Sequence, residues 1–320
     1  MDGRAPTENI GSFVALGDSF TEGLNDRTPA GLYRGWADRF ADLLAADQPG
    51  LRYANLAIRG KLLGEVAREQ VPRAVELRPD LVSIAAGGND ILRPGSDPDE
   101  LAQVFDQAVL SLRGAGCRVL LFTGFDPSAF PVIRMLRGKV AVFNMHLRTI
   151  AVARDCVLVD LWSMKMLGDR RMWSADRLHL NSEGHRRVSL YVAEMAGVPA
   201  PADWREPLED AAPAGQVPRP VAGAAAVAGA SASAGGEAGR RAVARLRTRL
   251  TSARDRADRS LAWMSARQQD TRWAVEYAVP WVRRRLRRKS SGDGIPPKRP
   301  DLLPLDALTG FTGGEAHESA

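Results

Sequence analysis

The sequence predicts an α/β domain in which helices cover a parallel sheet on both faces. Short apolar runs alternate with amphipathic segments throughout residues 10–200. Two of these runs, 81–86 and 119–122, are apolar at nearly every position instead of at every second one. Such runs are typical of strands that are buried on both faces of a sheet. The regular alternation of strands and helices favours parallel strands joined by crossover helices.

The strands and helices can be placed in order along the chain. Five segments are predicted as strands: 12–16, 52–56, 81–86, 118–123 and 157–161. Apolar residues at helical spacing predict helices over 36–44, 62–75, 98–113 and 143–151, and a last helix that begins after Asn181 or Ser182. Pro72 is expected to interrupt or restart the second helix, because proline has no N–H to donate. Asp97 and Pro98 are a typical start for the third.

Polar residues follow four of the predicted strands. The first strand leads into Gly17-Asp18-Ser19, the second is followed by Gly60, the third by Gly87-Gly88-Asn89-Asp90, and the fifth by Asp176-Arg177-Leu178-His179. Ligands of open α/β sheets bind at the carboxyl ends of the strands. We therefore expect these four groups to form one active site.

The residue types at these positions are those that an esterase needs. Ser19 is a candidate nucleophile, His179 can take its proton as a neutral imidazole, and Asp176 can orient that imidazole. The backbone N–H groups of Ser19 and Gly60 and the side-chain amide of Asn89 are candidate donors to an oxyanion. Taken singly, each motif has an ordinary explanation as a turn, a cap or a loop glycine. Their joint occurrence at successive strand ends favours catalysis.

The four blocks resemble those of the GDSL, or SGNH, hydrolase family over residues 10–200. The resemblance implies a flavodoxin-like three-layer α/β/α sandwich with a five-stranded parallel sheet, and cleavage of acyl esters through an acyl-serine intermediate without a cofactor or metal. It implies that Ser19 attacks, that His179 transfers the proton, that Asp176 orients His179, and that Ser19, Gly60 and Asn89 bind the oxyanion. We expect Asp18 and Asp90 to hold these residues in place from behind, without taking part in the reaction themselves.

Charge and composition divide the chain into four parts. Residues 211–320 hold 19 Lys and Arg against 10 Asp and Glu, so the net charge of +6 comes from this part of the chain. We expect a hydrolase domain over 1–205, a disordered Ala/Gly/Pro-rich linker over 206–239, a basic amphipathic helical extension over 240–290 and a disordered tail over 291–320.

The cationic run 283–289 allows three interpretations. It can adsorb to an anionic membrane surface, contact nucleic acid, or form the solvated face of a packed helix. The third is favoured because charge runs are usually solvated faces, and nucleic acid is the least favoured. The expected partner is a small ester or lipid substrate, and a weak anionic membrane contact through Arg283 to Lys289 stays open as the alternative to the packed helix.

The remaining signals concern location, thiols and histidines. The N-terminus lacks the apolar core of a signal peptide, so a cytoplasmic location is expected, with an allowance for peripheral membrane contact. Cys117 and Cys156 are interpreted as reduced thiols, and no Cys/His/Asp cluster has zinc spacing. His185 is expected to be solvated, and His146 to pack or cap a helix.

Two alternatives to an ordinary esterase remain open. One is a lysophospholipase-like or thioesterase-like activity at a membrane surface, which the basic extension favours. The other is a catalytically silent binding module that keeps the same fold.

Overall fold

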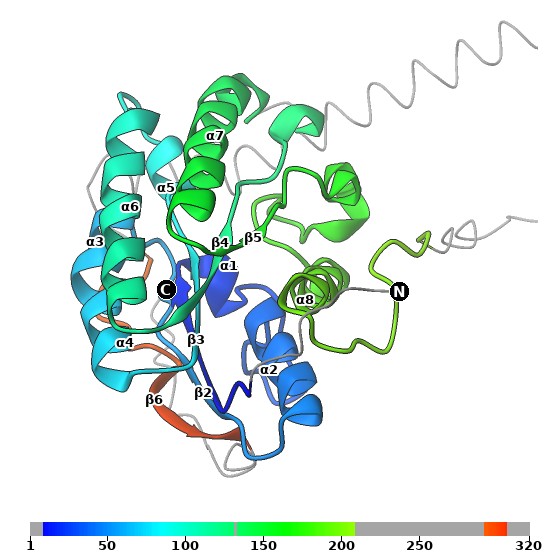
Figure 1. Ribbon diagram of the computed structural model, residues 1–320. Helices are drawn as coiled ribbons and strands as arrows, with labels where there is room; N and C mark the ends of the chain where they lie inside the picture. Colours follow the sequence, from blue (N-terminus) through cyan, green and yellow to red (C-terminus); the bar gives the residue numbers. More distant parts are fainter. Residues whose placement is uncertain (1–8, 131–132, 209–290, 306–320) are drawn as a thin grey trace, which may run out of the picture. The chain divides into compact units, whose positions relative to one another are not determined.

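The computed structural model describes residues 9–130, 133–208 and 291–305, and these form a mixed six-stranded sheet between two layers of helices (Figure 1). The strand order is β5-β4-β3-β1-β2-β6. The strands are β1 (Ser12–Gly17), β2 (Arg52–Asn55), β3 (Leu81–Ala85), β4 (Arg118–Phe122), β5 (Val157–Val159) and β6 (Arg299–Pro304). Strands β1 to β5 are mutually parallel, as the sequence predicts.

The sixth strand differs from the expectation of a five-stranded parallel sheet. Strand β6 pairs antiparallel with β2, with Arg52 opposite Pro304 and Asn55 opposite Arg299. It lies within the range 291–320, for which we expected a disordered tail. The sequence signal is weak because β6 is an edge strand that is mostly exposed and contains Pro300 and Pro304, residues that sheets tolerate at their edges. The basic extension, residues 209–239 of the linker and residues 306–320 of the tail lie outside the described residues.

Helices cover both faces of the sheet (Figure 1). One face packs against α3 (Leu63–Glu65), α4 (Val71–Leu77), α6 (Pro98–Gly114) and α7 (Arg137–Ala153). The other packs against α2 (Trp36–Asp47) and α8 (Ser182–Ala196). Because helices cover both faces, a central strand must be apolar at successive positions, as strand β1 shows. Val14 and Leu16 join the core under α6 and α7, whereas Phe13, the residue before Val14, meets Phe40 of α2 at a ring-centroid distance of 5.2 Å.

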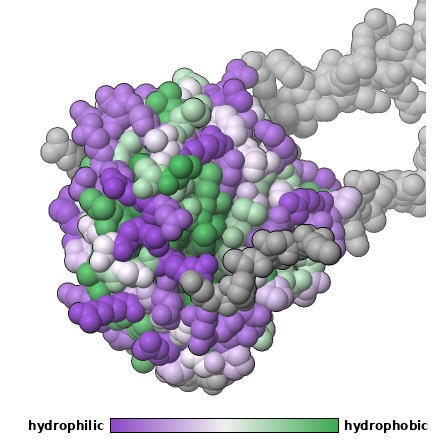
Figure 2. Space-filling model, viewed as in Figure 1, coloured by the Kyte–Doolittle hydropathy of each residue, from purple (hydrophilic) through white to green (hydrophobic). Residues whose placement is uncertain are grey.

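Shorter helical segments complete the domain: α1 (Ser19–Glu22), α5 (Gly88–Ile91), a π-helical turn η1 (Val66–Gln70), and four 3₁₀ turns at Pro127–Ala129, Arg134–Leu136, Lys165–Gly168 and Arg170–Met172. The helix predicted over 62–75 is divided as expected, because Pro72 lies in the first turn of α4 and the π-helical turn precedes it. On the face shown in Figure 2, hydrophobic residues gather at the middle and hydrophilic residues surround them. Among the described helices, none combines the length and hydropathy needed to cross a bilayer.

Candidate active site

Ser19, His179 and Asp176 lie in one row at the carboxyl edge of the sheet. Ser19 is the first residue of α1, directly after β1, and its Oγ lies 2.9 Å from His179 Nε2. His179 Nδ1 lies 2.6 Å from Asp176 Oδ2. The histidine and the aspartate come from the loop between β5 and α8. The structure thus brings together side chains that are 160 positions apart in sequence.

The loop that carries the histidine is closed by its own hydrogen bonds. Trp173 bridges Leu180 in antiparallel fashion, and the Ser174 N–H donates to His179 O at 2.9 Å. Asp176 Oδ1 accepts hydrogen bonds from the Ser174 hydroxyl and from the N–H groups of Leu178 and His179. Burial alone would raise the pKa of Asp176, but the hydrogen bonds from His179, Ser174 and Leu178 hold it well below its ordinary value. The carboxylate is therefore charged at neutral pH.

The candidate oxyanion donors lie on loops that meet beside Ser19. Asn89 is in α5, and its Nδ2 donates to Asp18 Oδ2 at 2.9 Å and to Lys61 O at 3.1 Å. Its amide thus touches the residue before Ser19 and the residue after Gly60. Gly60 has a φ of 76°, a conformation that other residues rarely adopt. The three expected donor residues therefore share one corner of the site.

The two acidic neighbours fix these loops. Asp18 caps α1 by accepting the Phe20 N–H at 3.1 Å, and Asp90 Oδ2 accepts the Leu63 N–H at 2.9 Å. Burial raises the pKa of Asp18 to about 6, against the lowering effects of the Phe20 N–H and His179. Asp18 is thus linked to both Ser19 and Asn89, and Asp90 holds the segment that follows Gly60.

Sequence reasoning missed three residues that hold the site. Asn25 has a φ of 71°, and its Nδ2 donates to Asp176 Oδ2 at 2.7 Å and to Ser174 Oγ at 3.1 Å. Gln70 is buried and pairs with both the N–H and the C=O of Gly17, at 2.8 and 2.9 Å. The only available signal for Asn25 is that asparagine tolerates a left-handed backbone. Gln70 gives none, because a single polar residue in a helix is normally exposed.

The third residue that holds the site and that sequence reasoning missed is Glu22, at the end of α1. Its side chain is 6% exposed and accepts hydrogen bonds from the Arg59 N–H at 2.8 Å and from the Arg59 guanidinium. Since Arg59 precedes Gly60, this ion pair joins the turn of Ser19 to the loop of Gly60. Glu22 lies three residues after Ser19, but this position in the sequence does not indicate its partner.

The prediction for His185 is wrong. This residue is 1% exposed, and its Nδ1 accepts a hydrogen bond from the Trp36 N–H at 3.1 Å. Helix α8 turns it toward α2 and not toward solvent, even though Arg186 follows it. Burial lowers the pKa of His185 to about 3.

His146, in contrast, lies at the surface, where its Nε2 is 2.6 Å from Asp99 Oδ1. Both cysteines are free thiols; Cys117 is buried and Cys156 partly so.

Comparison with known proteins gives the family of this chain and, through the family, the class of ester hydrolases. Residues 15–187 match the GDSL-like lipase/acylhydrolase family. Because the match spans more than half of the chain, the protein belongs to this family, as its four sequence blocks indicate. The comparison with curated proteins finds no match.

Solved structures share the fold. The crystal structure of TesA has 25% sequence identity and a TM-score of 0.50, and the similarity covers 57% of this chain and 97% of TesA. A catalytic mutant of Axe2, an acetylxylan esterase from Geobacillus stearothermophilus, has 21% identity, a TM-score of 0.50 and coverage of 62% and 98%. A putative GDSL-like lipase from Parabacteroides merdae has 17% identity, a TM-score of 0.51 and coverage of 59% and 97%. The similarity to each spans nearly the whole of the solved chain.

Proposed function

We propose that the protein hydrolyses carboxylic esters through an acyl-serine intermediate, with Ser19 as nucleophile, His179 as base and Asp176 as its orienting group. The observation that carries this proposal is the continuous row of 2.9 and 2.6 Å contacts from Ser19 Oγ through the imidazole to the Asp176 carboxylate. A serine hydroxyl becomes a nucleophile when a neutral base lies within hydrogen-bond reach. Asp176 is charged, so it favours the tautomer that leaves Nε2 free to accept the proton.

The reaction proceeds in two halves. Ser19 Oγ bonds to the ester carbonyl carbon while its proton moves to His179 Nε2, and the collapse of the tetrahedral species breaks the bond to the alcohol, which leaves with that proton. Water then attacks the acyl group, His179 accepts the water proton, and the acid is released as that proton returns to Ser19. The backbone N–H groups of Ser19 and Gly60 stabilise the oxyanion, and so does the Asn89 amide once one of its protons turns from Asp18 Oδ2 or Lys61 O to the substrate. Each such donor contributes about two to three orders of magnitude in rate.

A substitution of the nucleophile tests this proposal. Ser19→Ala should abolish turnover of p-nitrophenyl acetate and labelling by a fluorophosphonate probe, and His179→Ala should abolish the labelling as well. Ser128→Ala is the matched control, because Ser128 is exposed on a different loop. Wild-type turnover no greater than that of the Ser19→Ala variant would favour a catalytically silent binding module with this fold.

A lipid-like ester at an anionic membrane is a second candidate substrate. The cationic run 283–289 lies outside the described residues, but it ends three positions before Gly292, which packs against Arg59 beside Gly60. The run therefore lies close in sequence to a segment that contacts the loop of Gly60. This closeness supports an activity on lipid esters.

Vesicle binding tests the second candidate. The full chain should sediment with anionic vesicles and hydrolyse esters held in them faster than esters in zwitterionic vesicles. Replacing the arginines of the run with glutamine should remove both effects and leave hydrolysis of p-nitrophenyl acetate unchanged. A truncation at residue 210 is less suitable because it also deletes β6. Equal sedimentation of both proteins would contradict the membrane contact.

A further inference from the structure

The part of the chain that returns to the sheet after the basic extension contacts two of the three segments that carry the proposed oxyanion donors, the turn of Ser19 and the loop of Gly60. We propose that residues 291–305 act as a positioning element of the active site, and that Lys298 is its principal positioning residue. The inference rests on the proposed function, because it assigns this segment a role in the reaction of Ser19. Nothing in the four sequence blocks indicates it.

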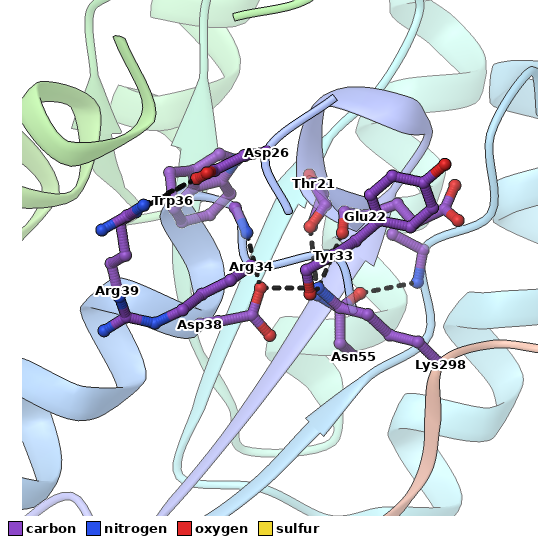
Figure 3. A network of polar contacts seen from close by, with 12 residues as sticks. Thr21, Glu22, Asp26, Tyr33, Arg34, Trp36, Asp38, Arg39, Asn55 and Lys298 are labelled. Atoms are coloured by element: carbon purple, nitrogen blue, oxygen red, sulfur yellow. Dashed lines mark hydrogen bonds and ion pairs between the residues drawn. The ribbon is translucent and has the colours of Figure 1, made fainter. Parts of the chain in front are cut away.

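Lys298 holds the end of the helix that begins at Ser19. Its Nζ donates to the Glu22 carbonyl at 2.7 Å, to the Tyr33 carbonyl at 3.3 Å and to Asp38 Oδ2 at 2.5 Å (Figure 3). All three ammonium protons are thus directed at oxygen atoms of the domain. Glu22 is the last residue of α1, and a cation at a helix C-terminus stabilises the exposed carbonyl groups there. The ammonium therefore fixes the far end of the single turn whose first residue is the nucleophile.

The environment of Lys298 is a built polar site. The lysine side chain is 20% exposed and that of Asp38 is 17% exposed. Asp38 also accepts the Gly35 N–H at 2.8 Å and the Tyr53 hydroxyl at 3.2 Å. Figure 3 shows the lysine reaching this network from the C-terminal segment, while the other labelled side chains come from the first part of the chain. Because charge-assisted hydrogen bonds are among the strong ones, loss of the ammonium would release Glu22 and Tyr33 together.

Glu22 transmits this position to the second loop. Its carbonyl is held by Lys298, and its carboxylate holds the Arg59 N–H and guanidinium. Arg59 is followed by Gly60, whose N–H is a proposed oxyanion donor. A shift of Glu22 therefore changes the positions of both Ser19 and Gly60, whose relative geometry stabilises the transition state.

Gly292 contacts the same loop directly. A Cβ at position 292 would lie 2.1 Å from Arg59 O and 2.7 Å from Ile58 Cγ2. No side chain fits this space unless the Arg59 backbone moves. The returning segment thus touches the Gly60 loop at Gly292 and the Ser19 turn at Lys298, two independent contacts from one stretch of chain.

Substitution of Lys298 in the full-length protein tests the inference. Lys298→Met should lower kcat for p-nitrophenyl acetate about 10–100-fold, the fold-change expected for the loss of one or two charged hydrogen bonds. The KM should change little, because the hydrogen bonds of the lysine go to Glu22, Tyr33 and Asp38 and not to Ser19, Gly60 or Asn89. Lys298→Arg should restore a large part of kcat, since it keeps the charge and several donors. The fluorophosphonate labelling rate should follow kcat.

A control on β6, the strand that follows Lys298, separates positioning from general loss of that strand. Asp301 of β6 pairs with Arg73 of α4 on the surface at 3.1 Å, away from Ser19 and Gly60. Asp301→Ala should keep wild-type kcat. Amide hydrogen exchange over residues 57–62 should accelerate in Lys298→Met but not in Asp301→Ala. Gly292→Ala, which keeps every charge, should lower kcat independently by displacing Arg59.

The outcomes distinguish this inference from the proposed function. Wild-type kcat and unchanged exchange over 57–62 in both Lys298→Met and Gly292→Ala would overturn the positioning role while Ser19-dependent hydrolysis stands. An equal loss of kcat in Asp301→Ala and Lys298→Met would also overturn it, because the effect would then be general. Turnover that does not depend on Ser19 would contradict the proposed function instead, and the exchange measurement would still report on the contact with Arg59.

Discussion

The two halves of the proposed active site are held in different ways. The half with His179 and Asp176 is a short loop whose hydrogen bonds mostly join residues within six positions of one another, from Ser174 to His179. The half with Ser19 is held by partners that are far away in sequence: Asn89 on Asp18, Gln70 on Gly17 and Lys298 on Glu22, at separations of 71, 53 and 276 positions.

This difference shows which contacts fix the positions of the catalytic residues in each half. The acid–base loop adopts its shape largely through its own sequence, with Asn25 as an outside contact to the carboxylate. The nucleophile turn is a single turn of helix and is too short to be stable alone. It therefore depends on the sheet, on the Glu22–Arg59 ion pair and on the returning segment. We expect substitutions far from Ser19 in sequence to affect the nucleophile half more than the acid–base half.

The largest effect should come from the centre of the acid–base half. Asp176→Asn keeps the size of the side chain but removes its charge, so the imidazole loses its orienting partner. We expect kcat to fall by about three to four orders of magnitude, with little change in thermal stability. Steady-state kinetics and a melting curve measure both. Asp203→Asn, at an exposed aspartate, is the control; a comparable loss there would show that the effect is not specific to the triad.

Acid should weaken the contact between α8 and α2. The folded state protonates His185 only near pH 3, because burial lowers its pKa and the nearby charges of Lys298, Arg39 and His179 add to this effect against that of Asp26. The unfolded chain takes up this proton near pH 6.5. Between these values the unfolded state binds more protons, so the free energy of unfolding should fall as pH falls, by up to about 1.4 kcal/mol per pH unit.

Denaturant titrations at several pH values check this prediction. His185→Asn keeps an acceptor for the Trp36 N–H but cannot take up the proton, so its stability should depend less on pH between about 6.5 and 4. If the variant and the wild type lose stability in parallel over this range, the acid sensitivity belongs to other groups.

Gln70→Leu should show whether the nucleophile half needs the Gln70 contact for its stability, for its activity or for both. The substitution leaves the buried Gly17 N–H without its acceptor, which costs about 1–3 kcal/mol in the free energy of unfolding. The end of β1 carries Asp18 and Ser19, so kcat should fall as well. Gln107→Leu, at an exposed position of α6, provides the comparison. Retention of full activity by the destabilised Gln70→Leu variant would mean that the turn keeps its geometry without this contact.

The smallest expected effect concerns the outside contact to the acid–base half. Asn25→Gly removes the amide but keeps the left-handed backbone at φ 71° free of strain. Because Asp176 keeps its other donors, we expect only about a tenfold loss in kcat, equivalent to about 1.4 kcal/mol. Kinetics for this variant beside Lys298→Met test the comparison directly: a larger loss in Asn25→Gly would reverse the assignment of the more dependent half.

Much of the fold and of the proposed site could be predicted from local patterns. The five parallel strands follow from short apolar runs, and helices on both faces follow from the spacing between them. Ser19, Gly60, Asn89 and His179 could be selected because the carboxyl ends of parallel strands converge. Asn25 and Gln70 could not be selected, because a single polar residue carries no sign of its distant partner. The prediction that His185 is exposed to solvent is wrong, because the charged neighbour Arg186 gives no information on the direction of the histidine side chain.

The sequence by itself determined the parallel sheet, the family and the residues proposed for the chemistry, since each depends on periodicity or on short motifs. Only the tertiary structure decided that residues 299–304 add an antiparallel edge strand and that Lys298 reaches the end of α1. An edge strand buries little apolar area and therefore leaves a weak pattern, and a contact across 276 positions depends on how the whole chain packs.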